Sequence, residues 1–296
     1  MKLKLLASAA ACSLIAASAQ AEIGFGGWGG LEYDNYDGDA IVHFRGDVLG
    51  TYTTQGGLVF GVGYYGDYFL GDGSNGFEEV DNGIYGLVSF GGLSSFGEVT
   101  LTYGEIWGAG NLFPEDYFGY DDSTGNSDQT LRVDAVLGDQ RFAVSYDFNG
   151  DDADFELGYA ANYGDWSVAV GYENDVQDLG ILVGRQFNDR WAGHFAMLND
   201  LDDDGSSDQY GVTGVFTPSE GLDLAANVAW SNDGFHSAGA LVTYEAERFI
   251  FKAEFLHHAD EESNEVEIGL VVPFGKPQPA HASRFALKEY TGFGLF

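Results

Sequence analysis

Two histidines and a nearby serine form one group of side chains in this sequence that could take part in catalysis. His257 and His258 lie close to Ser263, and a serine beside a histidine is the pair that hydrolases use for nucleophilic attack. Adjacent histidines can also bind a metal, but no third ligand is evident. The sequence has no Gly-x-Ser-x-Gly motif and no phosphate-binding loop. We therefore expect a protein that is not an enzyme and has no resident cofactor or metal.

Runs of aspartate form a second group of possible ligands, at Asp151–Asp152 and Asp202–Asp204. Clusters of carboxylate oxygens bind Ca²⁺, but the spacing of an EF-hand loop is missing here. We expect at most loosely bound calcium at these acidic loops, where divalent ions could bridge to lipopolysaccharide.

A third group of carboxylates lies in the segment Gly108–Asp128 and comprises Glu115, Asp116, Asp121 and Asp122. Such side chains make or break no bond, but a row of carboxylates that lines a pore favours cations. The alternative is that they form a solvated external face. The choice depends on the elements that carry this segment.

Those elements are predicted to be β-strands, because apolar residues recur with a period of two from Glu22 onward. Phe142, Val144 and Tyr146, for example, alternate with Ala143 and Ser145, so that each strand has an apolar face and a second face. We count about sixteen strands of roughly 8–13 residues, close to the length that a tilted strand needs to cross a bilayer. The strand Leu179–Phe187 breaks the pattern, because Arg185 falls on its apolar face. A β-bulge there would resolve the conflict.

The connections between the strands alternate in length. Tight turns are predicted at Gln55–Gly57, Gly138–Asp139, Gly164–Asp165, Asn188–Asp189, Pro218–Gly221 and Ala246–Glu247. Longer acidic loops are predicted at Asn35–Asp39, Gly71–Asn82, Gly108–Asp128, Gly150–Ala153, Asn174–Asp178, Asp200–Ser207, Asn232–Gly234 and Ala259–Asn264. Short periplasmic turns and longer external loops are typical of a transmembrane antiparallel β-barrel. Aromatic residues at the strand ends would form its interfacial girdle, and they include Tyr33, Trp107, Tyr163, Trp166, Trp191, Trp230 and Tyr244.

Composition and the chain ends agree with an exported protein. Residues 1–21 have a basic start, an apolar run at Leu5–Ala17 and the small-x-small site Ala19–Ala21, which is the layout of a signal peptide cleaved after Ala21. The one cysteine, Cys12, lies inside it, so the mature chain has no disulfide. A formal charge of −35 argues against a nucleic-acid partner. We assign residues 22–274 to the barrel.

From Glu22 to Phe274 the chain resembles a Gram-negative general diffusion porin of the compact, acidic alphaproteobacterial type. The segment Phe113–Gly119 (FPEDYFG) is similar to the Pro-Glu-Phe-Gly sequence of that family's constriction loops. The resemblance implies that Gly108–Asp128 folds into the pore, although it is short for the family. It also implies a homotrimer in which Gly71–Asn82 latches onto a neighbour. Residues 275–296 depart from the family: they are either a C-terminal extension or evidence that the last strand, Val266–Phe274, is wrongly assigned.

Four basic residues are predicted on the pore wall: Arg45 and Arg132 as the main candidates, with His43 and Lys252. The resemblance implies that they oppose the loop carboxylates and create a transverse field across the constriction. We therefore predict a cation-preferring outer-membrane porin for passive diffusion of small hydrophilic solutes. The alternatives are a solute-specific or structural and adhesive barrel, and a soluble secreted β-sandwich that binds calcium or sugar.

Overall fold

Sixteen β-strands make up nearly all of the described chain. The computed structural model describes residues 22–36, 39–71, 78–91, 97–106, 108–109, 129–148, 154–174, 178–201, 208–232, 234–259 and 263–275. The strands are β1 (Glu22–Tyr36), β2 (Asp39–Thr53), β3 (Val59–Gly71), β4 (Glu78–Ser89), β5 (Glu98–Gly104), β6 (Thr130–Leu137), β7 (Gln140–Asp147), β8 (Asp154–Tyr163), β9 (Trp166–Glu173), β10 (Asp178–Asn188), β11 (Trp191–Asp200), β12 (Gln209–Ser219), β13 (Leu222–Ser231), β14 (Gly234–Ala246), β15 (Phe249–His258) and β16 (Ser263–Gly275). Within the described part of the chain, no helix is long and apolar enough to cross a membrane.

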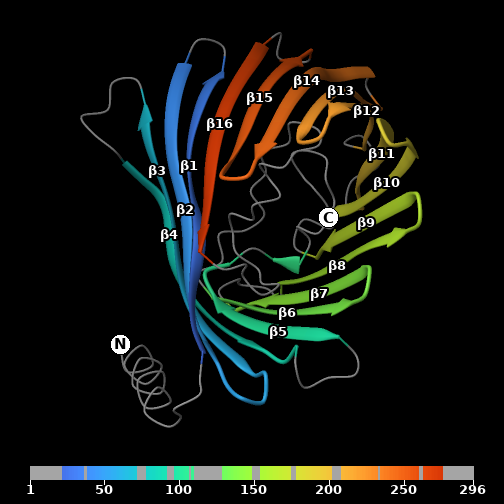
Figure 1. Cartoon of the computed structure of the whole chain (residues 1–296). Helices are drawn as coiled ribbons and strands as arrows, with labels where there is room; N and C mark the ends of the chain where they lie inside the picture. The colour runs from blue at the N-terminus through green and yellow to red at the C-terminus, as the bar shows by residue number, and fades with distance from the viewer. Residues whose placement is uncertain are drawn as a thin grey trace.

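The strands form one closed antiparallel barrel. Each strand pairs with its neighbours in sequence, and β16 pairs with β1 in a register that runs from Gly26–Gly275 to Tyr36–Glu265. Figure 1 shows β16 lying beside β1, so the sheet has no open edge. The predicted antiparallel barrel of about sixteen strands is therefore confirmed.

The barrel has its apolar side chains on the outside. On β7, Phe142, Val144 and Tyr146 are 40%, 50% and 40% exposed, whereas the alternate Ala143 and Ser145 are each 2% exposed. The same alternation places large exposed hydrophobic residues on all the other strands. A soluble sandwich would bury these faces against each other. An exposed apolar band around a closed barrel needs an apolar medium, as in a transmembrane barrel.

Short connections gather at one end of the barrel, and residues 138–139, 164–165, 189–190, 220–221 and 247–248 are examples. Gly138 begins the β6–β7 turn with φ +63°, a conformation that two-residue hairpins require and that glycine adopts without strain. Both ends of the barrel sequence, Glu22 and Gly275, lie at this turn end.

The predicted alternation of connection lengths holds for most of the barrel but not everywhere. The predicted loop Asn35–Asp39 shrinks to residues 37–38, and Asn232–Gly234 shrinks to residues 232–233. The predicted loop Gly71–Asn82 shrinks to 72–77, because β4 begins at Glu78. The reason is that backbone pairing continues into polar residues beyond the apolar band, where side-chain alternation gives no signal.

Arg185 stays on the outer face, contrary to the expected bulge. The irregularity in the β10–β11 register lies between Gln186 and Asn188, after the arginine. The Arg185 guanidinium lies 4.9 Å from the centre of the Trp166 ring and 5.8 Å from that of Phe187. A cation over an aromatic face at the barrel rim is stabilised without turning inward.

A charged side chain should lower the free energy of unfolding more on the outer face of the barrel than on the lumen face. Val228 is 45% exposed in the middle of β13, and we expect Val228→Arg to lower the free energy of unfolding in lipid vesicles by about 2–4 kcal/mol. The neighbouring Asn227 lies on the lumen face, so Asn227→Arg should cost much less. Urea titration followed by tryptophan fluorescence measures both, and equal losses would contradict this assignment of the faces.

Candidate functional site

The lumen face carries a row of charged side chains across β1, β2 and β3. Arg45 on β2 is bracketed by two carboxylates: its Nη1 lies 3.2 Å from Glu32 Oε1, and its Nε donates to Asp67 Oδ2 at 3.1 Å. His43 Nδ1 lies 3.2 Å from the other oxygen of Asp67. Glu32 and Asp67 are almost fully buried and Arg45 is partly exposed. The arginine is therefore held between two acids and cannot act as an isolated positive charge.

Lys252 on β15 is held in the same way. Its Nζ lies 3.0 Å from Glu267 Oε2 on β16 and 3.1 Å from Glu254 Oε2 on its own strand. Because β15, β16, β1, β2 and β3 are consecutive in the barrel, this group continues the row that contains Arg45. The row then holds four carboxylates against Arg45, Lys252 and His43, so acidic side chains outnumber basic ones on this stretch of wall.

A second charged group lies on β6 and β7. Arg132 is 1% exposed and pairs with both oxygens of Asp134, through Nε and Nη2 at 2.9 Å each. Arg141 donates from Nη2 to the same Asp134 Oδ1 at 2.8 Å. Bidentate arginine–carboxylate pairs are strong and fixed in geometry. Asp134 therefore fixes both guanidinium groups against the wall.

Arg132 also holds the beginning of the long connection between β5 and β6. Arg132 Nη1 donates to the Gly108 carbonyl at 2.5 Å, and the Ala109 amide donates to Ser145 Oγ at 2.7 Å. A Cβ at Gly108 would overlap the side chain of Glu156 on β8. Residues 108 and 109 therefore lie against the inner wall of the barrel, over β6, β7 and β8, which is the direction that the resemblance implied for this connection.

The four predicted wall residues, Arg45, His43, Arg132 and Lys252, all belong to strands and none is fully exposed. The structure brings Arg45 and His43 together on Asp67 and places Lys252 in the same row. Arg132 lies four strands from Arg45, in a separate group. The predicted constriction carboxylates Glu115, Asp116, Asp121 and Asp122 lie outside the described residues, as do the aspartate runs 151–152 and 202–204.

The candidate site residues chosen from the sequence did not include the carboxylates that neutralise these cations. They are Glu32, Asp67, Asp134, Glu254 and Glu267. Each is a polar position within a strand of alternating apolar residues, as Glu32 is between Leu31 and Tyr33. That alternation places them on the lumen face, but the contacts of Arg45 with Glu32 and Asp67, and of Lys252 with Glu267, join different strands and depend on register.

His257 and His258, which the sequence suggested as possible catalytic or metal-binding residues near Ser263, make contacts between neighbouring strands. His257 Nδ1 lies 3.1 Å from the backbone carbonyl of Ser263 and 3.1 Å from Asn264 Oδ1, and His258 Nε2 lies 3.2 Å from Glu265 Oε2. These contacts join β15 to β16 near the loop end. Among the described residues, no three His, Cys, Asp or Glu side chains are grouped as metal ligands would be.

Comparison with known proteins identifies the fold. No protein-family model matches the sequence, and no curated protein matches it. Among solved structures, a multiply substituted mutant of Rhodopseudomonas blastica porin is 16% identical with a TM-score of 0.67, and a triple mutant of that porin is 16% identical with a TM-score of 0.66. A third, "Asymmetric conductivity of engineered proteins", is also 16% identical, with a TM-score of 0.65. Each alignment covers 86% of this chain and 100% of the other. The chain thus has the porin fold.

Removal of Arg132 should cost more than removal of Arg141, although both contact Asp134. Arg132 is fully buried and also holds Gly108, whereas the Arg141 side chain is 24% exposed. We expect Arg132→Ala to lower the free energy of unfolding by about 3 kcal/mol, because it leaves a buried carboxylate with one partner fewer. Arg141→Ala should lower it by clearly less. Urea unfolding of the detergent-refolded barrel measures this difference, and equal losses would refute the anchoring role of Arg132.

Proposed function

We propose that this chain is an outer-membrane porin: an exported barrel with a water-filled channel for passive diffusion of small hydrophilic solutes and ions. The observation that carries the proposal is the closed barrel of sixteen strands with an apolar outer face and a charged inner wall. Barrels of this size can enclose an aqueous channel. The fold shared with Rhodopseudomonas blastica porin supports the same function and an outer-membrane location.

Cation preference is proposed from the charge of the wall. Arg45 and Lys252, which could have attracted anions, each lie between two carboxylates. Rings and rows of carboxylates in a pore raise the local concentration of cations. The loop acids Glu115, Asp116, Asp121 and Asp122 would add to this negative field if they line the constriction. Arg45 and Arg132 are each paired with carboxylates, so neither would present an isolated positive charge to the loop acids.

Planar-bilayer recording of the purified protein in a KCl gradient tests the channel and its selectivity together. We expect ohmic single-channel steps and a reversal potential of the sign for K⁺ preference. Glu32→Gln with Glu267→Gln should lower the K⁺/Cl⁻ permeability ratio roughly twofold or more, because two wall carboxylates are lost. Glu220→Gln with Glu247→Gln, in the exposed β12–β13 and β14–β15 turns, removes the same charge and is the matched control. Folded protein without conductance would refute the porin, and anion preference would refute the selectivity.

A homotrimer is proposed from the outer surface of β1, β2 and β3. Gly29 on β1 and Gly46 on β2 are cross-strand partners and leave this part of the surface without side chains, whereas Gly66, next to Gly46 on β3, is covered by the rings of Tyr64 and Tyr68. In membranes, small residues let protein surfaces approach closely, which favours association. The resemblance implied that Gly71–Asn82 latches onto a neighbour. The connection between β3 and β4 comprises residues 72–77, which lie outside the described residues.

A large side chain at Gly29 should separate the subunits without harming the barrel. A Cβ at Gly29 has no atom within 4 Å, and the same is true of Gly214 on the outer face of β12, five strands away. We expect Gly29→Trp to convert trimers into monomers, while Gly214→Trp remains trimeric. Light scattering of the detergent-solubilised variants measures the state. A trimeric Gly29→Trp would show that the row of glycines lies outside any subunit interface.

External partners complete the proposal. Outer-membrane lipid would surround the apolar band, and lipopolysaccharide would meet the loop end. Loosely bound Ca²⁺ at the acidic loops would bridge to it.

A solute-specific channel would need an accessible aromatic surface in the lumen. The described lumen aromatics Trp28, Tyr65 and Tyr85 are at most 5% exposed, so general diffusion is favoured.

A further inference from the structure

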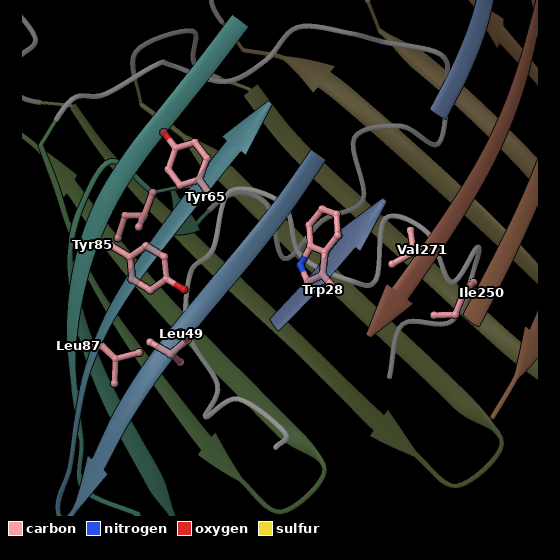
Figure 2. Close-up of a cluster of buried hydrophobic side chains, with 8 residues drawn as sticks. Trp28, Leu49, Tyr65, Tyr85, Leu87, Ile250 and Val271 are labelled. Carbon is pink, nitrogen blue, oxygen red and sulfur yellow. The ribbon is translucent and has the colours of Figure 1, made fainter. Parts of the chain in front are cut away.

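An apolar patch lies on the lumen wall, in addition to the charged row. We call it the lumen patch; it consists of Trp28, Leu49, Tyr65, Tyr85, Leu87, Ile106, Ile250 and Val271. Figure 2 shows the labelled members of the patch on neighbouring strands, with Leu49, Leu87 and Tyr85 close together and Trp28 beside Val271 and Ile250. Apolar residues are unusual on a wall that faces water, because polar side chains line the interior of a transmembrane channel.

The lumen patch is covered. Trp28 is 5% exposed, Leu49 is 1%, and Tyr65 and Val271 are 0%. In a barrel of sixteen strands, side chains on one wall do not reach the opposite wall, since such barrels enclose a channel. Only Ile106 in the patch comes from outside the strands. The wall itself covers one side of the patch, because Leu49 and Leu87 lie over Gly61 and Tyr85 lies over Gly63. The side that faces the lumen needs a further segment.

The patch lies near the place where β16 ends. Val271 and Trp28 are four and two residues from the paired glycines Gly275 and Gly26 at the turn end. Gly275 has φ +75°, and a Cβ there would clash with the Phe25 carbonyl, so this position requires glycine. Pro277 follows and cannot continue the ladder as a central strand does.

The sequence after Gly275 suits the patch and the row of acids beside it. Residues 276–296 contain Lys276, Arg284 and Lys288 against a single acid, Glu289. Phe285 and Leu287 lie between the last two cations. The charged row has two more carboxylates than permanent cations, and its members Glu32 and Glu267 follow Trp28 and Val271 toward the loop end. Twenty-one residues (276 through 296) can extend to about 70 Å, so reach is no obstacle.

We propose that residues 276–296 return from Gly275 into the lumen and dock on the lumen patch. Phe285 and Leu287 supply the apolar contacts, and Arg284 and Lys288 face the acidic row. The docked segment narrows the channel. The narrowing rests on the proposed porin function, but the docking does not.

A disulfide between wall and tail tests the docking independently of conductance. Ser89→Cys is combined with Ala286→Cys, and the natural thiol of Cys12 is lost with the expected signal peptide. Ser89 faces the lumen two residues from Leu87, and the exchange is nearly isosteric. The control pairs Ala286→Cys with Thr213→Cys on the lumen face of β12, eight strands away. We expect mild oxidation to cross-link the first pair several-fold faster. Equal or slower cross-linking than in the control would overturn the docking.

Single-channel conductance tests the narrowing. A chain that ends at Phe274 should conduct about twice as much as the full chain, since the segment no longer fills part of the lumen. Phe285→Asp with Leu287→Asp keeps the full length and should give the same increase, while Gln278→Asp with Thr291→Asp adds the same charge without loss of apolar contacts and should not. Unchanged conductance in both the shortened and the Phe285/Leu287 variants would overturn the narrowing. Absence of conductance in every chain would instead refute the porin, and the disulfide result would still decide the docking.

Discussion

Closure of the sheet is the constraint on which the rest of this structure depends. Backbone N–H and C=O groups in an apolar medium must be paired within the protein, and a sheet achieves this only when its first and last strands meet. Here β1 and β16 pair over a register from Gly26–Gly275 to Tyr36–Glu265. Once the sheet is closed, the two faces become an outside and an inside. The period-two sequence then places Val144 in one environment and Ser145 in the other.

The interior combines two kinds of surface on the strands around that closure. Toward the loop end, Glu32, Arg45 and Asp67 form an ion-pair row that leaves the wall net negative. Toward the turn end, Trp28 and Val271 begin an apolar patch. Carboxylates outnumber cations in the row because each cation lies between two acids. The positive residues therefore order the wall, and the excess acids set its sign.

On β6, an arginine joins the barrel wall to a connection between strands. Arg132 contacts both oxygens of Asp134 and the carbonyl of Gly108, so a planar group with several donors joins the wall to the start of the long connection. A lysine could supply the charge but not this geometry. The inward direction of residues 108 and 109 thus depends on a buried polar contact, with Ser145 providing a second one to the Ala109 amide.

The sequence alone was sufficient to predict the barrel, its strand number and which face of most strands is apolar, because each of these follows from local alternation. Local alternation ends where side chains become polar on both faces. The end of β1 at Tyr36, the start of β4 at Glu78 and the short connection 37–38 were therefore not predicted. Adjacent aromatics such as Tyr64 and Tyr65 show that one must face inward without showing which.

Only the tertiary structure decided which charges meet. Arg45 and Asp67 are 22 residues apart, and Lys252 and Glu267 are 15 apart, so their contacts depend on strand register and not on any motif. Arg185 remained outside because Trp166, on the neighbouring strand, offers its ring to the guanidinium. Composition and periodicity are properties of the chain, whereas pairing between strands is set by closure and register, and that is why the partner of each charge could be read only from the folded barrel.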